Sequence, residues 1–158
     1  MPALGSIMQI HAPLEAVFDL ASDYDRQLRW DPLLREASFV RGTAPGTGSR
    51  VRLRYAAGLS VTLEYFGFTR PSVMAVKMVR GPRYFRQLVG SWHFRALEDG
   101  DTEVTFKCVY EARYPWIGWL CDPLVFRVLA RANRKRLRGL KRGAEELGLI
   151  EVARRAGE

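Results

Sequence analysis

The side chains best suited to bind a small molecule in this chain are aromatic, and they recur at every second position of several strand-like segments. Successive side chains of a β-strand point to opposite faces of the sheet, so alternation assigns residues to faces. Segment 50–55 shows this most clearly, because its arginines alternate with apolar residues and must face water. The inner face then receives a set of large, mostly aromatic side chains: Tyr55, Tyr65, Met74, Met78, Leu88, Trp92, Phe94, Phe106 and Tyr110. Such a face is suited to contact with an apolar molecule.

The same inner face offers few groups for acid–base or metal chemistry. No Asp, Glu or His has inward parity in the strands whose alternation is clear, and these residues are the usual general acids and bases. We expect His11 and His93 to lie on the surface, and neither they nor Cys108 and Cys121 have the spacing of a metal site. The sequence therefore predicts no metal and no cofactor. It also predicts reduced cysteines in a cytoplasmic protein.

A mainly antiparallel sheet must position these side chains. We expect seven strands, at 4–11, 33–41, 50–56, 59–68, 73–80, 84–97 and 102–113. Two short helices, at 13–21 and 23–30, separate the first two strands, and one long helix closes the chain. This order predicts an α+β fold in a single domain, 1–158, with a core at 4–147 and a frayed tail at 148–158. Because one long helix must cover seven strands, we expect part of the inner face to remain uncovered.

The closing helix carries the net charge of the protein. Between Pro123 and Ala144 there are eight basic residues and no acidic ones, while basic and acidic residues balance in the rest of the chain, whose formal net charge is +8. At about 100° per residue, the basic residues form one stripe and apolar residues form the opposite one. Asn133 and Arg136 interrupt the apolar stripe and are expected to point toward the sheet. A buried arginine there needs an anion or another hydrogen-bond acceptor.

The basic stripe has three interpretations. A solvated helix face is the default, because charge runs on helices are usually no more than that. Attraction to an anionic membrane surface comes second, since the neighbouring segment from Trp116 to Leu120 could insert among lipids. Nucleic-acid binding comes third, because the stripe has no interleaved aromatic residues for stacking. We expect no signal peptide, because the first residues lack a basic stretch followed by a long apolar run, and no apolar stretch is long enough to predict a membrane span.

Several short motifs occur in a recognisable order. They are Ala12-Pro13-x-Glu15-x-Val17-Phe18, Trp30-x-Pro32, Trp92-x-Phe94, Thr102-x-Val104-Thr105 and Leu140-Lys141-x-x-Ala144-Glu145. In this order, over about 7–147, the chain resembles the START-like helix-grip (SRPBCC) superfamily, and within it the bacterial polyketide cyclase/dehydrase and lipid-transport branch. The resemblance implies a curved seven-stranded antiparallel sheet that grips the last helix, with a hydrophobic tunnel between them. It does not identify the ligand.

The predicted function is the binding, and the transfer, of a hydrophobic or amphiphilic small molecule or lipid in that tunnel. The candidate ligand-binding residues are Trp30, Tyr55, Tyr65, Met78, Arg86, Leu88, Trp92, Phe94, Phe106, Tyr110, Asn133 and Arg136. Connections in an antiparallel meander alternate between the two ends of the sheet, so the links near 30–33, 57–58, 81–83 and 114–119 should share the end that forms the mouth. The mouth candidates are Arg80, Tyr84, Tyr114, Trp116 and Trp119.

Two other functions stay open. The resemblance includes aromatase/cyclases, and an enzyme of that kind acting on a polyketide-like substrate would use tyrosine and arginine, here Tyr55, Tyr65, Tyr110, Arg86 and Arg136. A filled core with a nucleic acid or protein partner bound by the basic helix is the second alternative. The sequence does not determine the oligomeric state.

Overall fold

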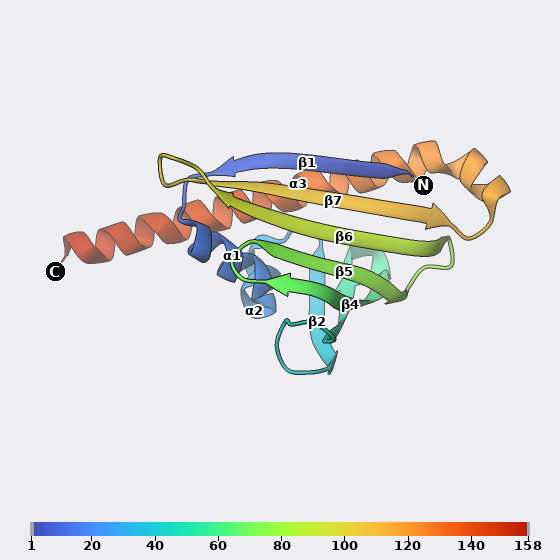
Figure 1. The fold of residues 1–158 in the computed structure, drawn as a ribbon, viewed down its shortest axis with the longest axis horizontal. Helices are drawn as coiled ribbons and strands as arrows, with labels where there is room; N and C mark the ends of the chain where they lie inside the picture. Colours follow the sequence, from blue (N-terminus) through green and yellow to red (C-terminus); the bar gives the residue numbers. More distant parts are fainter. Residues whose placement is uncertain (1, 158) are drawn as a thin grey trace.

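The computed structural model describes residues 2–157 as a seven-stranded sheet with two short helices on one face and one long helix (Figure 1). In chain order the elements are β1 (Ala3–Ile10), α1 (Leu14–Ser22), α2 (Tyr24–Trp30), β2 (Leu34–Arg41), β3 (Arg50–Tyr55), the 3₁₀ turn η1 (Ala56–Gly58), β4 (Ser60–Thr69), β5 (Val73–Arg80), β6 (Phe85–Ala96), β7 (Thr102–Ala112) and α3 (Pro115–Ala156). The predicted α+β class and the predicted order of elements are confirmed.

All strand pairs are antiparallel, in the order β1-β7-β6-β5-β4-β3-β2. The chain therefore runs as a meander from β2 to β7, and β1 joins the far edge beside β7. Across the sheet the strand direction changes strongly, so that β2 crosses the direction of β1 and β7 (Figure 1). This twist turns the inner face into a concave surface.

Local sequence signals explain the two short helices. Pro13 precedes α1 in an extended conformation, where a proline costs no helical hydrogen bond. Asp23 caps α2, because its carboxylate accepts hydrogen bonds from the backbone N–H groups of Asp25 at 3.0 Å and Arg26 at 3.4 Å. The chain then leaves α2 at Trp30 toward Pro32, as the sequence predicted.

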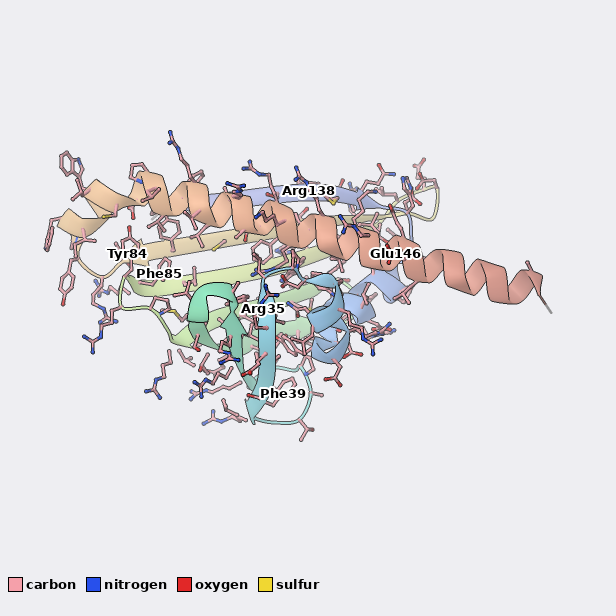
Figure 2. The ribbon with its side chains drawn as sticks, turned by 180° about the vertical axis from the view of Figure 1, so that it is seen from behind. Arg35, Phe39, Tyr84, Phe85, Arg138 and Glu146 are labelled. Atoms are coloured by element: carbon pink, nitrogen blue, oxygen red, sulfur yellow. The ribbon has the colours of Figure 1, made fainter. Side chains whose placement is uncertain are left out.

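The long helix α3 packs on β1, β7, α1 and α2, and lies across the sheet on the side seen in Figure 2. Its contact with α2 requires glycine, since a Cβ at Gly139 would lie 2.2 Å from the backbone oxygen of Trp30. The helix continues to Ala156, beyond the predicted end of the core at residue 147. The fraying predicted for 148–158 stays a prediction, because the side chains of 148–155 and residue 158 lie outside the described part of the structure.

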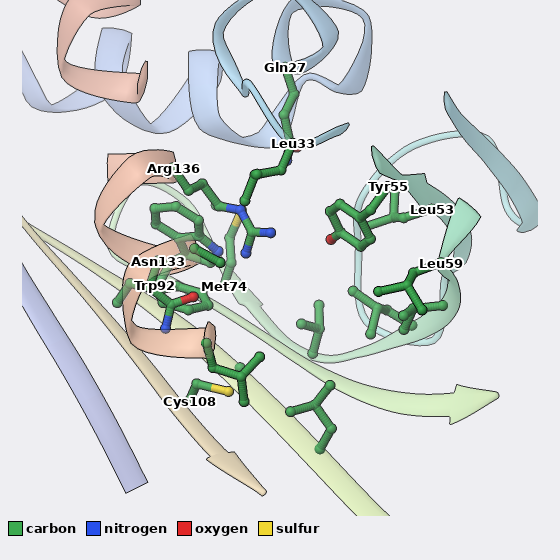
Figure 3. A pocket seen from close by; sticks show the side chains of 18 of the residues that line it. Gln27, Leu33, Leu53, Tyr55, Leu59, Met74, Trp92, Cys108, Asn133 and Arg136 are labelled. Atoms are coloured by element: carbon green, nitrogen blue, oxygen red, sulfur yellow. The ribbon is translucent and has the colours of Figure 1, made fainter. Parts of the chain in front are cut away.

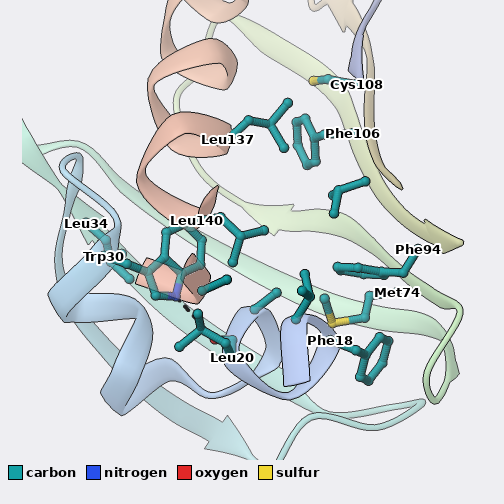
Figure 4. Close-up of a cluster of buried hydrophobic side chains, with 14 of the residues drawn as sticks. Phe18, Leu20, Trp30, Leu34, Met74, Phe94, Phe106, Cys108, Leu137 and Leu140 are labelled. Carbon is teal, nitrogen blue, oxygen red and sulfur yellow. Dashed lines mark hydrogen bonds between the residues drawn. The ribbon is translucent and has the colours of Figure 1, made fainter. Parts of the chain in front are cut away.

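Buried side chains concentrate where α1, α2 and α3 meet the sheet (Figure 4). Phe18 of α1 makes edge-on contacts with Phe94 and Phe68, and Leu137 and Leu140 approach from α3. This cluster fills one part of the concave face. The remaining inner surface, mainly on β3 to β6, is not filled in the same way.

Candidate functional site

A cavity of about 300 Å³ lies between α2, the inner face of the sheet and α3 (Figure 3). Its apolar lining comes from the alternate inward positions of the strands, including Leu53, Val61, Leu63, Val76 and Cys108. Its volume is at the lower end of the range typical of small-molecule sites. The cavity is therefore large enough for a modest organic ligand.

Seven of the twelve predicted ligand-binding residues line this cavity: Tyr55, Tyr65, Leu88, Trp92, Phe106, Asn133 and Arg136. The strand residues among them have the orientation that alternation predicted. Asn133 and Arg136 of α3 point toward the sheet, as the helical projection predicted. The tertiary structure thus gathers these side chains around one space.

Four other predicted residues belong to the packed interior and do not line the cavity. Trp30 lies beneath α3, where its indole N–H donates to the backbone oxygen of Leu20 at 3.2 Å. Phe94 is buried beside Trp92, and Tyr110 is fully buried with its hydroxyl donating to the backbone oxygen of Asp122 at 3.3 Å. Met78 packs against the core cluster. The space expected around these residues is occupied by protein.

Arg86, a predicted ligand-binding residue, and Arg80, a predicted mouth residue, have inward parity when alternate positions of their strands are counted. Both side chains are exposed in the structure. The ladder between β6 and β7 contains an irregularity at Phe85 to Gln87, so Phe85 faces the cavity and Arg86 points out toward Glu111 at 3.7 Å. A similar irregularity in the β4–β5 ladder precedes Arg80. An extra residue in one strand moves every side chain beyond it to the opposite face of the sheet. A prediction that counts alternate residues from the strand centre does not detect this change.

The cavity opens at part of the predicted mouth, but most of the side chains named for the mouth do not line it. Leu59 and Val128 both line it and are exposed to solvent, so the opening lies between the η1 region and α3. Tyr84 instead donates a hydrogen bond to the carboxylate of Asp122. The other mouth candidates, Tyr114, Trp116 and Trp119, are exposed beyond the cavity lining. Three of the four links predicted to share this end, near 30–33, 57–58 and 81–83, contribute the lining residues Leu33, Ala56, Leu59 and Pro82, and the link at 114–119 contributes none.

The sequence prediction named Trp30 on α2 but missed the two residues of α2 that do line the cavity. Tyr24 and Gln27 line the cavity, and the hydroxyl of Tyr24 lies 2.6 Å from that of Tyr65 on β4. Helix α2 is too short for a reliable apolar stripe, so no signal in the sequence assigned it a cavity-facing side. The strand residues that were not named as candidates, such as Leu53 and Cys108, did have inward parity.

Arg136 is the only charged side chain among the described residues that line the cavity. Its Nε donates to Asp31 at 3.2 Å, and the two side chains are 15% and 0% exposed. Burial alone would lower the pKa of Arg136, but the interactions with Tyr55 and Asp31 outweigh burial and raise it. Arg136 therefore remains charged and faces Tyr55 across the cavity, with its guanidinium carbon 5.4 Å from the ring centre (Figure 3).

The other polar groups of the cavity are neutral near pH 7. Burial raises the pKa of Tyr65 to about 12 and that of Cys108 to about 11, and it also raises the pKa values of Tyr24 and Tyr55. These groups consequently stay protonated near pH 7 and are not general bases. Among the described residues, no group of three or more His, Cys, Asp and Glu comes together in a way that could hold a metal ion.

The fold defines the class of protein: an antiparallel sheet around a long C-terminal helix with a cavity between them is the arrangement of the START-like helix-grip superfamily. Residues 6–145 match the family described as polyketide cyclase/dehydrase and lipid transport. The chain belongs to this family, as the motif order predicted.

Solved structures of low sequence identity share the fold. A protein from Thermus thermophilus is 22% identical, with a TM-score of 0.78, over 92% of this chain and 99% of that chain. A START superfamily protein from Mycobacterium smegmatis is 15% identical, with a TM-score of 0.77, over 92% and 98%. An aromatase/cyclase from Streptomyces sp. R1128 is 16% identical, with a TM-score of 0.77, over 91% and 93%. No curated protein matches the chain.

Proposed function

We propose that the protein binds a hydrophobic or amphiphilic small molecule or lipid in the cavity between the sheet and α3. The observation that carries this proposal is the cavity itself, about 300 Å³ with a mainly apolar lining and an opening at Leu59 and Val128. Solid packing is the norm in protein interiors, so a cavity of this size is unlike the few small voids that a core usually contains. The family membership agrees with ligand binding in general.

Native mass spectrometry of the purified protein tests the proposal directly. We expect a co-purifying molecule that organic extraction removes. The matched variants are Ala132→Phe, which adds a ring at a cavity-lining position of α3, and Ile7→Phe, which adds bulk at an exposed position of β1. Ala132→Phe should abolish retention and Ile7→Phe should leave it unchanged. Equal retention in both variants would contradict binding in the cavity.

A second candidate function is catalysis of the aromatase/cyclase type. It is favoured by one observation: a neutral tyrosine hydroxyl and a charged guanidinium, those of Tyr55 and Arg136, face the same space. Such a pair could polarise a carbonyl and stabilise an enolate, although a general base is not provided by the described cavity residues. Turnover of a poly-β-keto substrate above background, and its loss in Tyr55→Phe, would support catalysis. Binding without turnover would restrict the function to a carrier.

Transfer of the ligand would require a surface where it is released. The first turns of α3 expose Trp116, Trp119, Leu120 and Leu124, and exposed basic residues follow along the same helix. We assign this face to an anionic membrane surface. A cytoplasmic location, inferred from the two cysteines, which are both free, is part of this proposal. No helix in the described part of the chain has the length and apolar character needed to span a membrane.

A further inference from the structure

The charge inside the cavity is already balanced by the protein. Asp31 lies directly behind Arg136, and its carboxylate accepts three hydrogen bonds, from Arg136 Nε at 3.2 Å, Gln27 Nε2 at 3.1 Å and the Leu33 backbone N–H at 2.9 Å. Both carboxylate oxygens are therefore satisfied, as a buried ionised group requires. The pair contributes no net charge to the cavity.

Arg136 still has donors to offer. A guanidinium carries five N–H donors, and only Nε is committed to Asp31. Within the described residues, no carboxylate or backbone oxygen accepts a hydrogen bond from its two terminal amino groups, and the Tyr55 hydroxyl is the one other polar side chain that interacts with the guanidinium. The aromatic rings of Tyr55 and Phe106 flank the guanidinium at 5.4 and 5.8 Å from their centres. Five donors are more than Asp31 and the Tyr55 hydroxyl use, so the terminal amino groups can also donate to a ligand.

Asn133 adds a second polar contact close to Arg136 on α3. It is 4% exposed, and its Nδ2 is buried without a hydrogen-bond partner in the described part of the chain. Leaving a buried amide unpaired costs free energy, which a polar ligand atom would recover. Arg136 and Asn133 thus form one polar site in an otherwise apolar space.

A carboxylate and a neutral carbonyl would differ sharply at this site. Both accept hydrogen bonds from Arg136, but a carboxylate would leave two negative charges sharing one positive charge in a medium of low dielectric constant. No other described lining residue is charged and able to compensate. A neutral carbonyl accepts the same charge-assisted hydrogen bonds and adds no net charge.

We propose that Asp31 acts as a built-in counter-ion that makes the cavity select apolar ligands with a neutral carbonyl, such as a ketone or an ester, over carboxylates. This inference rests on the proposed ligand-binding function and specifies the class of ligand. It assigns to Asp31 a role in specificity without contact with the ligand.

Three probes of equal chain length test the inference: 2-decanone, decanoate and decane. Their affinities are measured by isothermal titration calorimetry at pH 8, where decanoate is ionised. We expect the wild-type protein to bind 2-decanone about tenfold more tightly than decanoate or decane, which corresponds to one charge-assisted hydrogen bond. Tighter binding of decanoate than of 2-decanone by the wild-type protein would overturn the inference.

The decisive variant is Asp31→Asn, which keeps the shape of the side chain and removes its charge. The unbalanced Arg136 should then favour decanoate, so the order of the two polar probes should reverse. Glu36→Gln is the charge-matched control, because Glu36 is exposed and pairs with Arg54 outside the cavity. It should preserve the wild-type order. An unchanged order in Asp31→Asn would overturn the inference.

A double variant protects the test against a failure of Asp31→Asn to fold. Asp31→Asn combined with Arg136→Met removes both charges, leaves Asn133 as the remaining donor of the polar site, and should reduce the preference for 2-decanone over decane while still binding decane. A preference as large as that of the wild-type protein would show that Arg136 is not the selecting group and would overturn the inference. If the wild-type protein binds none of the three probes and retains no co-purifying molecule, the ligand-binding function itself fails, and this result differs from a wrong order of affinities.

Discussion

Two buried amides near the cavity have opposite environments. Gln27 donates to Asp31 at 3.1 Å, whereas Nδ2 of Asn133 has no partner among the described residues. Both side chains are almost fully buried. An unpaired buried donor lowers the stability of the folded protein. A ligand that accepts a hydrogen bond from Nδ2 of Asn133 would offset this loss, which gives a reason for an amide on the apolar side of α3. The two residues therefore offer a matched comparison between structural and functional polar groups.

Replacement of Asn133 should separate stability from binding. We expect Asn133→Leu to raise the free energy of unfolding of the ligand-free protein by about 1–3 kcal/mol, because an unsatisfied amide is removed. The same change should weaken ligand retention in native mass spectrometry. Gln27→Leu, which removes a satisfied hydrogen bond, should lower stability by a similar amount. A loss of stability in Asn133→Leu, measured by urea unfolding, would show that the amide has a structural partner.

The thiol of Cys108 provides a probe of the cavity. Because burial raises its pKa to about 11, only on the order of one molecule in a thousand carries the reactive thiolate at pH 8. In a Cys121→Ser background, we expect alkylation by iodoacetamide to be slow at pH 8 and to accelerate as the pH approaches 11. Unfolding in guanidinium should remove this protection. Rapid alkylation of the folded protein at pH 8 would contradict the buried environment.

At the scale of elements, α3 exposes different kinds of side chain along its length. Its first turns expose Trp116 and Trp119, which are 69% and 85% exposed, and its following turns expose Arg127, Arg131 and Arg134. No salt bridge is present at these three arginines within the described residues. Apolar and basic side chains on one helix are the combination that binds an anionic lipid surface.

Vesicle binding tests this assignment. We expect co-sedimentation with phosphatidylcholine vesicles that contain phosphatidylserine, weaker binding to phosphatidylcholine alone, and a decrease with salt. Trp116→Ser with Trp119→Ser should abolish binding. Arg131→Gln with Arg134→Gln should weaken it by about 2 kcal/mol, at about 1 kcal/mol per charge. Arg86→Gln with Arg95→Gln, which removes the same charge from β6, should have little effect, and an equal effect of both pairs would indicate non-specific attraction.

At the scale of the whole molecule, buried tyrosine and cysteine side chains that stay protonated determine how stability depends on pH at alkaline pH. The folded protein raises the pKa of Tyr65 from 10.0 to about 12 and that of Cys108 from 9.0 to about 11. Such groups bind protons more tightly in the folded state, so they add to the free energy of unfolding. This stabilisation is complete below the pKa values of the unfolded chain, and it is lost as the pH rises through the pKa values of the folded protein.

We therefore expect the free energy of unfolding to be nearly constant from pH 7 to 8 and to fall between about pH 9 and 12. A shift of two units corresponds to about 2.7 kcal/mol for each group when the whole range is covered. Tyr65→Phe should reduce this decline, and Tyr114→Phe, at an exposed position, should not. Urea unfolding at several pH values measures the effect. An identical decline in Tyr65→Phe and the wild-type protein would contradict the raised pKa.

Much of the fold and part of the site were predictable from local patterns. Alternation in β3 placed Tyr55 on the inner face, and the helical projection of α3 placed Asn133 and Arg136 opposite the basic stripe. These predictions depend only on the periods of strands and helices, which hold wherever the element is regular. They failed for Arg80 and Arg86, where an irregular ladder interrupts the period of β5 and β6.

The sequence by itself determined the class of fold, the faces of the regular elements and the location of the excess charge on α3. Only the tertiary structure decided that Asp31 neutralises Arg136, since the two residues are 105 positions apart and meet because α2 packs on α3. It likewise decided that Trp30 fills space beneath Gly139, and that the cavity opens at Leu59 and Val128. Such pairings depend on how separate elements pack against one another. The side-chain volumes and paired charges at such a contact leave no periodic signal along the chain.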